Sequence, residues 1–187
     1  PTNIFAHRSA PRHNTSDAPN RVDPNASFTS GALNINAPPV TMFVVGTDSA
    51  PATVVQGTPN LPMLTLKART GSYTTRWSQL RLTRTGTGQD ANVPAVKLYR
   101  DADGDGLLSI ALDERLSTGV FSGGTVLLSF STQTVTVTTQ TFFVTYDIKT
   151  TATAGESLGV RIAAAGDLRV QTPDTVSTAG FPLQSTD

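Results

Sequence analysis

Cysteine is absent from this 187-residue chain, and histidine occurs only twice. Without cysteine there is no disulfide and no thiolate that could hold a metal or act as a nucleophile. Both histidines, His7 and His13, lie near the N-terminus. A catalytic centre built on histidine is therefore not expected in the rest of the chain. We predict that the protein is not an enzyme.

Charged residues are also scarce. They make up 15% of the sequence, and 14 basic residues balance 14 acidic ones. A protein that binds nucleic acid electrostatically carries a basic excess, so no nucleic-acid partner is expected. No apolar run approaches the roughly 20 residues that a bilayer crossing needs, so no membrane span is expected. The threonine-rich, charge-poor composition is typical of a β-protein outside the cell, and we predict an extracellular or cell-surface location.

The N-terminal segment differs from the rest of the chain. Residues 1–25 are rich in Pro, Asn, Ser and Arg without a sustained hydrophobic period, and such a segment should not fold on its own. Asn14 and Asn25 each begin a glycosylation sequon in it. Residues 26–36 have the pattern of a strand with a kink at Gly31. We predict an extended arm over residues 1–38.

From Val40 onward, apolar and polar residues alternate with the period of two that half-buried strands show. The strongest stripe consists of Phe142, Val144, Tyr146 and Ile148, and glycine-containing breaks such as Gly123-Gly124 separate the runs. One short helix is expected, over residues 110–116. Many short strands at this spacing predict an all-β fold, a β-sandwich or jelly roll, over residues 39–187.

The segment from Asp101 to Gly106 places three carboxylates at alternate positions, with a glycine after the third. This is the ligand order of a calcium loop, in which the oxygens turn inward and the glycine makes a sharp bend. Because clustered carboxylates repel one another, the loop should either bind a hard divalent cation or open. We predict structural Ca²⁺ with the ligands Asp101, Asp103, Asp105, Leu107 and Asp113.

The sequence does not decide which residue is the closing ligand of this loop. An EF-hand has a bidentate acid at the twelfth position, which is Leu112 here, whereas Asp113 and Glu114 follow one and two residues later. Either acid could close the site. The alternative for the whole segment is an ordinary Asp/Gly turn between strands, because both residue types favour turns.

Two segments resemble bacterial and archaeal fibre-forming surface proteins of the TasA/camelysin type. Residues 26–35 are similar to that family's early strand, of the form F-x-S-G-x-L-x-hydrophobic. The block from Val55 through Leu64-Thr65-Leu66 to Gly71-Ser72 is similar to its next strand, loop and turn, although Thr70 rather than Asn precedes Gly71. The resemblance implies a jelly-roll subunit whose N-terminal segment completes the sheet of the next subunit in a filament.

Elementary geometry is compatible with such strand donation. Residues 26–36 would span about 36 Å when extended, and a sandwich with an open edge invites an added strand. A head-to-tail contact of this kind propagates into a filament. The alternatives are that the segment is the first strand of its own sandwich, or a tether. The predicted interface residues of the donor strand are Phe28, Ala32, Leu33 and Ile35.

The predicted function is therefore a structural, calcium-stabilised subunit of an extracellular homopolymer, a pilus-like or biofilm filament. The alternative is a calcium-dependent adhesion or carbohydrate-binding module, with glycans as partners. A sugar-binding platform could use Trp77, Tyr73, Tyr99 and Tyr146, but Trp77 is more readily explained as core. Lys67, Lys97 or Lys149 could form an isopeptide bond with an asparagine, but few asparagines lie in the predicted strands.

Overall fold

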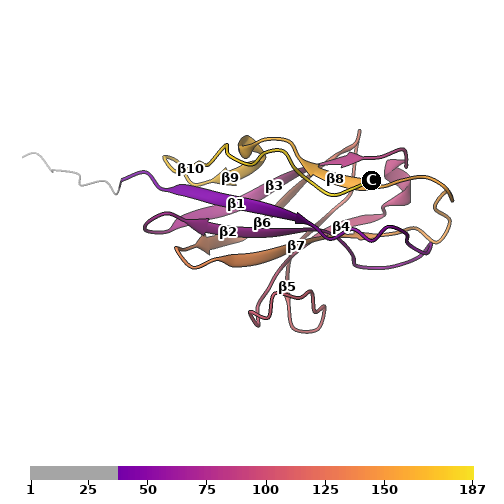
Figure 1. The fold of residues 1–187 in the computed structure, drawn as a ribbon, viewed down its shortest axis with the longest axis horizontal. Coiled ribbons are helices and arrows are strands. Elements are labelled where there is room, and N and C mark those ends of the chain that lie inside the picture. The colour runs from indigo at the N-terminus through magenta and orange to yellow at the C-terminus, as the bar shows by residue number, and fades with distance from the viewer. Residues whose placement is uncertain (1–37) are drawn as a thin grey trace, which may run out of the picture. The chain divides into compact units, whose positions relative to one another are not determined.

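A computed structural model describes residues 38–187, in which two β-sheets pack face to face (Figure 1). The all-β sandwich predicted from the alternating pattern is confirmed. Residues 1–37 lie outside the described part of the chain. The predictions for the arm, the donor strand with Phe28, Ala32, Leu33 and Ile35, and the sequons at Asn14 and Asn25 therefore remain predictions.

The first sheet has the strand order β10-β1-β2-β7-β4-β5. All neighbours in it are antiparallel except β1 and β10, which run parallel. Its strands are β1 (Thr41–Asp48), β2 (Leu61–Thr70), β4 (Ala95–Arg100), β5 (Glu114–Gly119), β7 (Gln140–Asp147) and β10 (Thr175–Val176).

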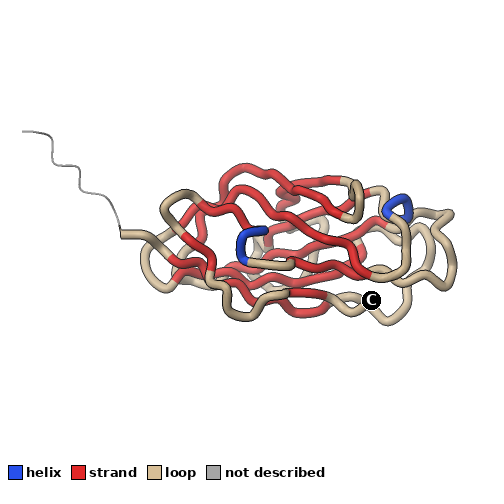
Figure 2. Tube along the Cα trace, turned by 90° about the horizontal axis from the view of Figure 1, so that it is seen from above, coloured by secondary structure: helices blue, strands red, loops and turns tan. Residues whose placement is uncertain are grey.

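The second sheet has the order β11-β8-β3-β6, and β9 also pairs with β3. Its strands are β3 (Thr75–Thr85), β6 (Thr125–Val135), β8 (Gly159–Ile162), β9 (Leu168–Val170) and β11 (Leu183–Gln184). Two single-turn helices, η1 (Asp90–Asn92) and η2 (Ala165–Asp167), lie in the connections, and the strands run along the long axis of the sandwich (Figure 2).

The core lies between the two sheets and follows the predicted alternation. On β2, for example, Leu64, Leu66 and Ala68 are buried while Lys67 and Arg69 are exposed. Trp77, the only tryptophan, is fully buried. Its indole packs edge-on against Phe130 of β6 and Phe142 of β7, with ring centroids 5.1 and 5.0 Å away. Because Phe142 belongs to the opposite sheet, Trp77 joins the two layers.

The prediction of a short helix over residues 110–116 is wrong. The backbone N–H groups of Leu112 and Asp113 both donate to the carbonyl of Ser109, which makes a single turn. The chain then enters β5, where Glu114 lies opposite Arg100 and Arg115 opposite Tyr99 on β4. Pairing with an existing strand satisfies more backbone groups than one isolated helical turn can, because a short helix has few internal hydrogen bonds.

The break expected at Gly123-Gly124 is a tight two-residue turn in the structure. Both glycines have positive φ, 60° and 76°, and Ser122 and Thr125 exchange backbone hydrogen bonds across them. Only glycine adopts this pair of conformations readily. The strands on its two sides, β5 and β6, belong to different sheets, so the turn carries the chain from one layer to the other. No helix within residues 38–187 has the length and apolar character for a membrane crossing.

Candidate metal site

The acidic loop forms the connection between β4 and β5, which projects from the body of the sandwich (Figure 1). Its first residue is fixed to the sheet, because the backbone N–H of Asp101 donates to the carbonyl of Thr141 at 3.0 Å. Its last residue, Asp113, precedes β5 directly. Two paired strands therefore hold both ends of an exposed loop.

The structure brings Asp101, Asp103 and Asp105 together, as their spacing predicts. One carboxylate oxygen from each lies within 4.8 Å of the others. Asp101 also organises the loop, since its two oxygens accept the backbone N–H groups of Gly104 at 2.7 Å and Gly106 at 2.9 Å. Gly104 and Gly106 both have positive φ, 79° and 77°, and this conformation allows the chain to curl around the Asp101 carboxylate.

Electrostatics at the centre of the loop favour a positive partner. The backbone N–H of Asp105 stabilises the charged form of Asp103. Partial desolvation and the negative charges of Asp105 and Asp113 outweigh it and raise the pKa of Asp103 above its ordinary value. A carboxyl group whose pKa is raised by like charges is one that a bound cation would relieve.

The two candidate closing ligands have different surroundings. Asp113 is buried, and its carboxylate accepts the backbone N–H groups of Ala102 at 3.1 Å and Ser109 at 2.7 Å. Glu114 instead forms an ion pair with Arg100, with 2.7 Å between Oε2 and a guanidinium nitrogen. Asp113 therefore closes the base of the loop, and Glu114 faces the neighbouring strand.

Leu107, another of the predicted ligands, follows the bend. Its N–H donates to Asp105 at 2.7 Å, and its side chain is exposed. Three carboxylates within 4.8 Å, on a loop whose donors are all oxygens, fit a hard divalent cation. Asp101, Asp103 and Asp105 are the residues that would hold it.

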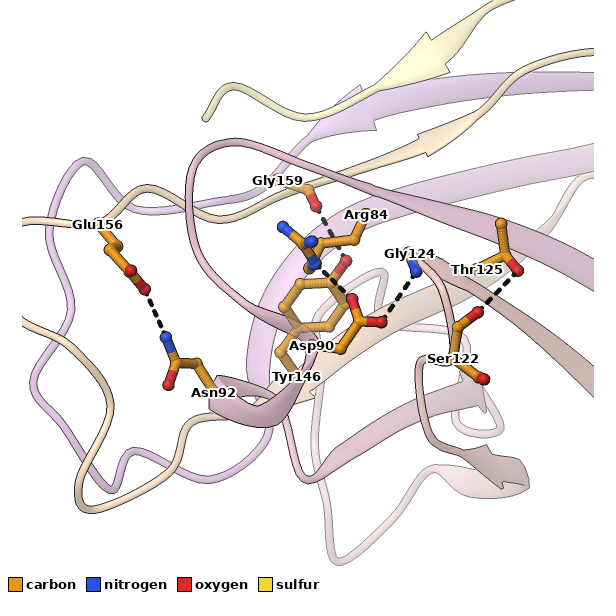
Figure 3. Close-up of polar contacts among 9 residues, drawn as sticks. All are labelled: Arg84, Asp90, Asn92, Ser122, Gly124, Thr125, Tyr146, Glu156 and Gly159. Carbon is orange, nitrogen blue, oxygen red and sulfur yellow. Dashed lines mark hydrogen bonds and ion pairs between the residues drawn. The ribbon is translucent and has the colours of Figure 1, made fainter.

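A second polar cluster lies around η1 at one end of the sandwich (Figure 3). Asp90 accepts from the Arg84 side chain at 2.7 Å and from the backbone N–H of Gly124 at 2.8 Å. These contacts lower the pKa of Asp90, the Gly124 hydrogen bond most strongly. Nearby, the Tyr146 hydroxyl donates to the carbonyl of Gly159 at 3.0 Å, and burial raises the pKa of Tyr146.

The same cluster includes Asn92, whose side-chain amide donates to Glu156 at 2.6 Å (Figure 3). Together these contacts tie η1 to β3, to the Gly123-Gly124 turn and to the segment before β8. Each of the groups is already used in a contact between elements. The cluster is therefore a structural brace rather than a site for a ligand.

The aromatic residues considered for sugar binding do not form a surface platform. Trp77 and Tyr146 are fully buried and Tyr99 nearly so, whereas Tyr73 alone is exposed. The prediction that Trp77 belongs to the core is confirmed. A stacking surface built on Trp77 is excluded.

No protein-family model matches the chain, and no curated protein matches it in sequence. The resemblance to TasA/camelysin proteins therefore stays a prediction.

Proposed function

We propose that the protein is a structural subunit of an extracellular filament, assembled by donation of the N-terminal arm to a neighbouring copy. The observation that carries the proposal is the incompletely paired outer edge of β1. On that side, β10 pairs only with Thr41 and Met42, although β1 continues to Asp48. An unpaired strand edge is a template for strand addition.

Apolar side chains accompany this edge. Phe43 and Val45 are exposed at 38% and 63% on the outer face of β1. They line a cavity of about 400 Å³ together with Lys67, Arg69 and Ala179. Further along, Leu183 of the second sheet packs against the inner face of β1 at Gly46, whereas Phe43 and Val45 lie on the outer face beside the unpaired stretch of the edge. The apolar residues predicted on the donor strand, Phe28, Leu33 and Ile35, suit such a surface.

The loop from Asp101 to Asp105 is proposed to bind structural Ca²⁺ within this subunit. The donor set of three clustered carboxylates supports a hard cation. Flexible, exposed loops of oxygen ligands suit Ca²⁺ better than Mg²⁺, which demands strict octahedral geometry. Because the loop connects β4 to the edge strand β5, a bound ion would fix the path of the chain between them.

Electron microscopy of the full-length chain tests the filament proposal. Regular filaments are expected, and deletion of residues 1–37 should leave folded single particles with unchanged far-UV circular dichroism. A wild-type chain that stays monomeric at high concentration, in calcium and without it, would contradict the proposal. Glycan binding by such a monomer would then favour the adhesion module instead.

A further inference from the structure

We propose that Lys97 and Asn60 form an intramolecular isopeptide bond, with Asp147 as the proton-transfer group. Two of the residues lie on neighbouring strands of the first sheet, and the third comes just before another strand of that sheet. Lys97 lies on β4 and Asp147 ends β7, while Asn60 immediately precedes β2. Because β7 lies between β2 and β4, the bond would join two strands across a third.

The reacting groups are already in contact. Lys97 Nζ lies 2.8 Å from Asn60 Oδ1. Since a carbonyl bond is about 1.2 Å long, the amine is within about 4 Å of the amide carbon that it would attack. That is close to the separation from which a bond forms after a small side-chain rotation.

Asp147 contacts both partners. Its two oxygens lie 2.9 and 2.7 Å from Lys97 Nζ, and Oδ1 also accepts the backbone N–H of Asn60 at 2.8 Å. Asn60 has a left-handed backbone, with φ of 51°, a conformation that asparagine tolerates better than most residues. The carboxylate thus holds the amide in place and lies where a proton acceptor for the amine is required.

A contact of Tyr99 would stabilise the charge that develops on the Asn60 side chain during attack. The Tyr99 hydroxyl lies 3.1 Å from Asn60 Oδ1 and donates to it, so it would stabilise negative charge on that oxygen in the tetrahedral intermediate. The site is shielded from much of the solvent, with the Lys97 side chain 13% exposed and that of Asp147 25% exposed. Tyr99 is 3% exposed, and Thr145, opposite Lys97 in the strand register, is fully buried. Limited access to water disfavours hydrolysis of the amide as a competing reaction.

The reaction needs neither an oxidant nor a co-reactant. Asp147 takes a proton from the Lys97 ammonium, and the free amine attacks Asn60 Cγ to form the new N–C bond. In all, two protons leave the lysine nitrogen. One passes through Asp147 to Nδ2, so that the C–N bond breaks and ammonia departs, and the other is released to solvent. The product is a secondary amide between the two side chains.

Intact-mass spectrometry of the folded full-length chain is the test. The mass should lie below that of the sequence by one ammonia. Trypsin should not cut after Lys97 and should release a branched peptide that joins residues 22–67 to residues 85–100. The variants Lys97→Arg, Asn60→Ala and Asp147→Asn should have the full mass for their sequences. Lys67→Arg, at an exposed lysine on β2, is the matched control and should keep the loss.

Two results would overturn the inference. The first is a wild-type chain of full mass that trypsin cuts after Lys97, and this result does not depend on whether any variant folds. The second is a loss of ammonia that persists in Lys97→Arg, because the loss would then come from another reaction, such as closure of an asparagine on its own backbone as a succinimide.

Discussion

Among the acidic residues of the metal loop, Asp103 contributes least to the hydrogen bonds that hold the loop together. Its carboxylate accepts one long hydrogen bond, 3.3 Å from the N–H of Asp105, whereas Asp101 accepts two shorter ones. Asp103→Asn should therefore melt like the wild type in chelator and lose only the response to calcium. For the wild type, calcium at ten times the dissociation constant should raise Tm by about 3–6 °C. Thermal melts with calcium and with chelator measure the difference.

Glu114→Gln is the matched control for that experiment. It removes the ion pair with Arg100, in which both side chains are well exposed, and such a pair contributes at most about 1 kcal/mol. The calcium response should persist, because Asp113 rather than Glu114 lies against the loop. Loss of the response in Glu114→Gln would identify Glu114 as the closing ligand. An equal response in Asp103→Asn and wild type would remove the metal assignment.

Asp90 links stability to pH. Its pKa in the folded state is lowered, first by the Gly124 N–H and then by Arg84, so the charged form is favoured by folding. The contribution is present above the unfolded pKa, about 3.9, and is lost as the pH falls through the lower folded value. Asp90→Asn should reduce the free energy of unfolding at pH 7 by about 1–2 kcal/mol.

Urea denaturation of wild type and Asp90→Asn at pH 7 and at acid pH measures this effect. The difference between the two proteins should shrink as the pH falls below the unfolded pKa. A difference that is the same at both pH values would show that the carboxylate charge is not what stabilises the brace.

The sequence predicts part of the residue-level chemistry. Alternate spacing was enough to bring Asp101, Asp103 and Asp105 together, because residues so close in a turn cannot separate far. The contact of Lys97 with Asn60 has no such local cause. Asn60 lies in a loop before β2, and strand register alone brings it to Lys97, so the pattern of strands in the sequence does not reveal the pair. The only local signal is the position of Asn60 directly before an apolar run.

At the scale of elements, the edge of β1 gives a prediction about assembly. Val45→Lys should abolish filaments, because a lysine on an edge strand opposes pairing with another chain. Val45 is 63% exposed, so the stability of the isolated subunit should change by no more than about 0.5 kcal/mol. Electron microscopy and a thermal melt of the same sample report the two quantities.

Val120→Lys is the control for Val45→Lys. Val120 is similarly exposed but follows β5, which lies at the opposite side of the first sheet from β1. Filaments should form normally with this variant. If Val45→Lys assembles as well as Val120→Lys, the edge of β1 is not the acceptor.

Element types followed from pattern where the pattern was long. Phe142, Val144 and Tyr146 of the predicted stripe lie in β7, and Ile148 follows the strand directly. All four side chains are buried. The error at residues 110–116 arose in a short segment, where pairing between β4 and β5 decided the outcome. Propensity has little weight over so few residues when a neighbouring strand is available.

At the scale of the whole molecule, Trp77 reports on both sheets at once. Because its ring contacts Phe142 across the core, separation of the sheets should expose it. Its fluorescence and the far-UV circular dichroism should change in one coincident transition on denaturation. Trp77→Ala should lower the free energy of unfolding by about 3–5 kcal/mol. Transitions with different midpoints would show that the two sheets unfold separately.

The strand order could not be predicted from periodicity. Alternation states that a strand has a buried face, and it carries no information about which strand lies beside it. The parallel contact of β1 with β10 joins residues that are far apart in the chain. The chain passes from β5 in the first sheet to β6 in the second through one glycine turn. Both features depend on how the two sheets pack together, which the pattern of a single strand does not contain.

The chain enters β1 at one end of the sandwich, and its C-terminus lies toward the opposite end (Figure 1). Tension applied to the chain where it enters β1 would act along that strand and load the antiparallel β1–β2 ladder in shear, so that its hydrogen bonds must break together. Survival under tension depends on the unfolding rate rather than on equilibrium stability. In the proposed filament, where the arm would transmit force to β1, the β1–β2 ladder would set how long a subunit survives under load.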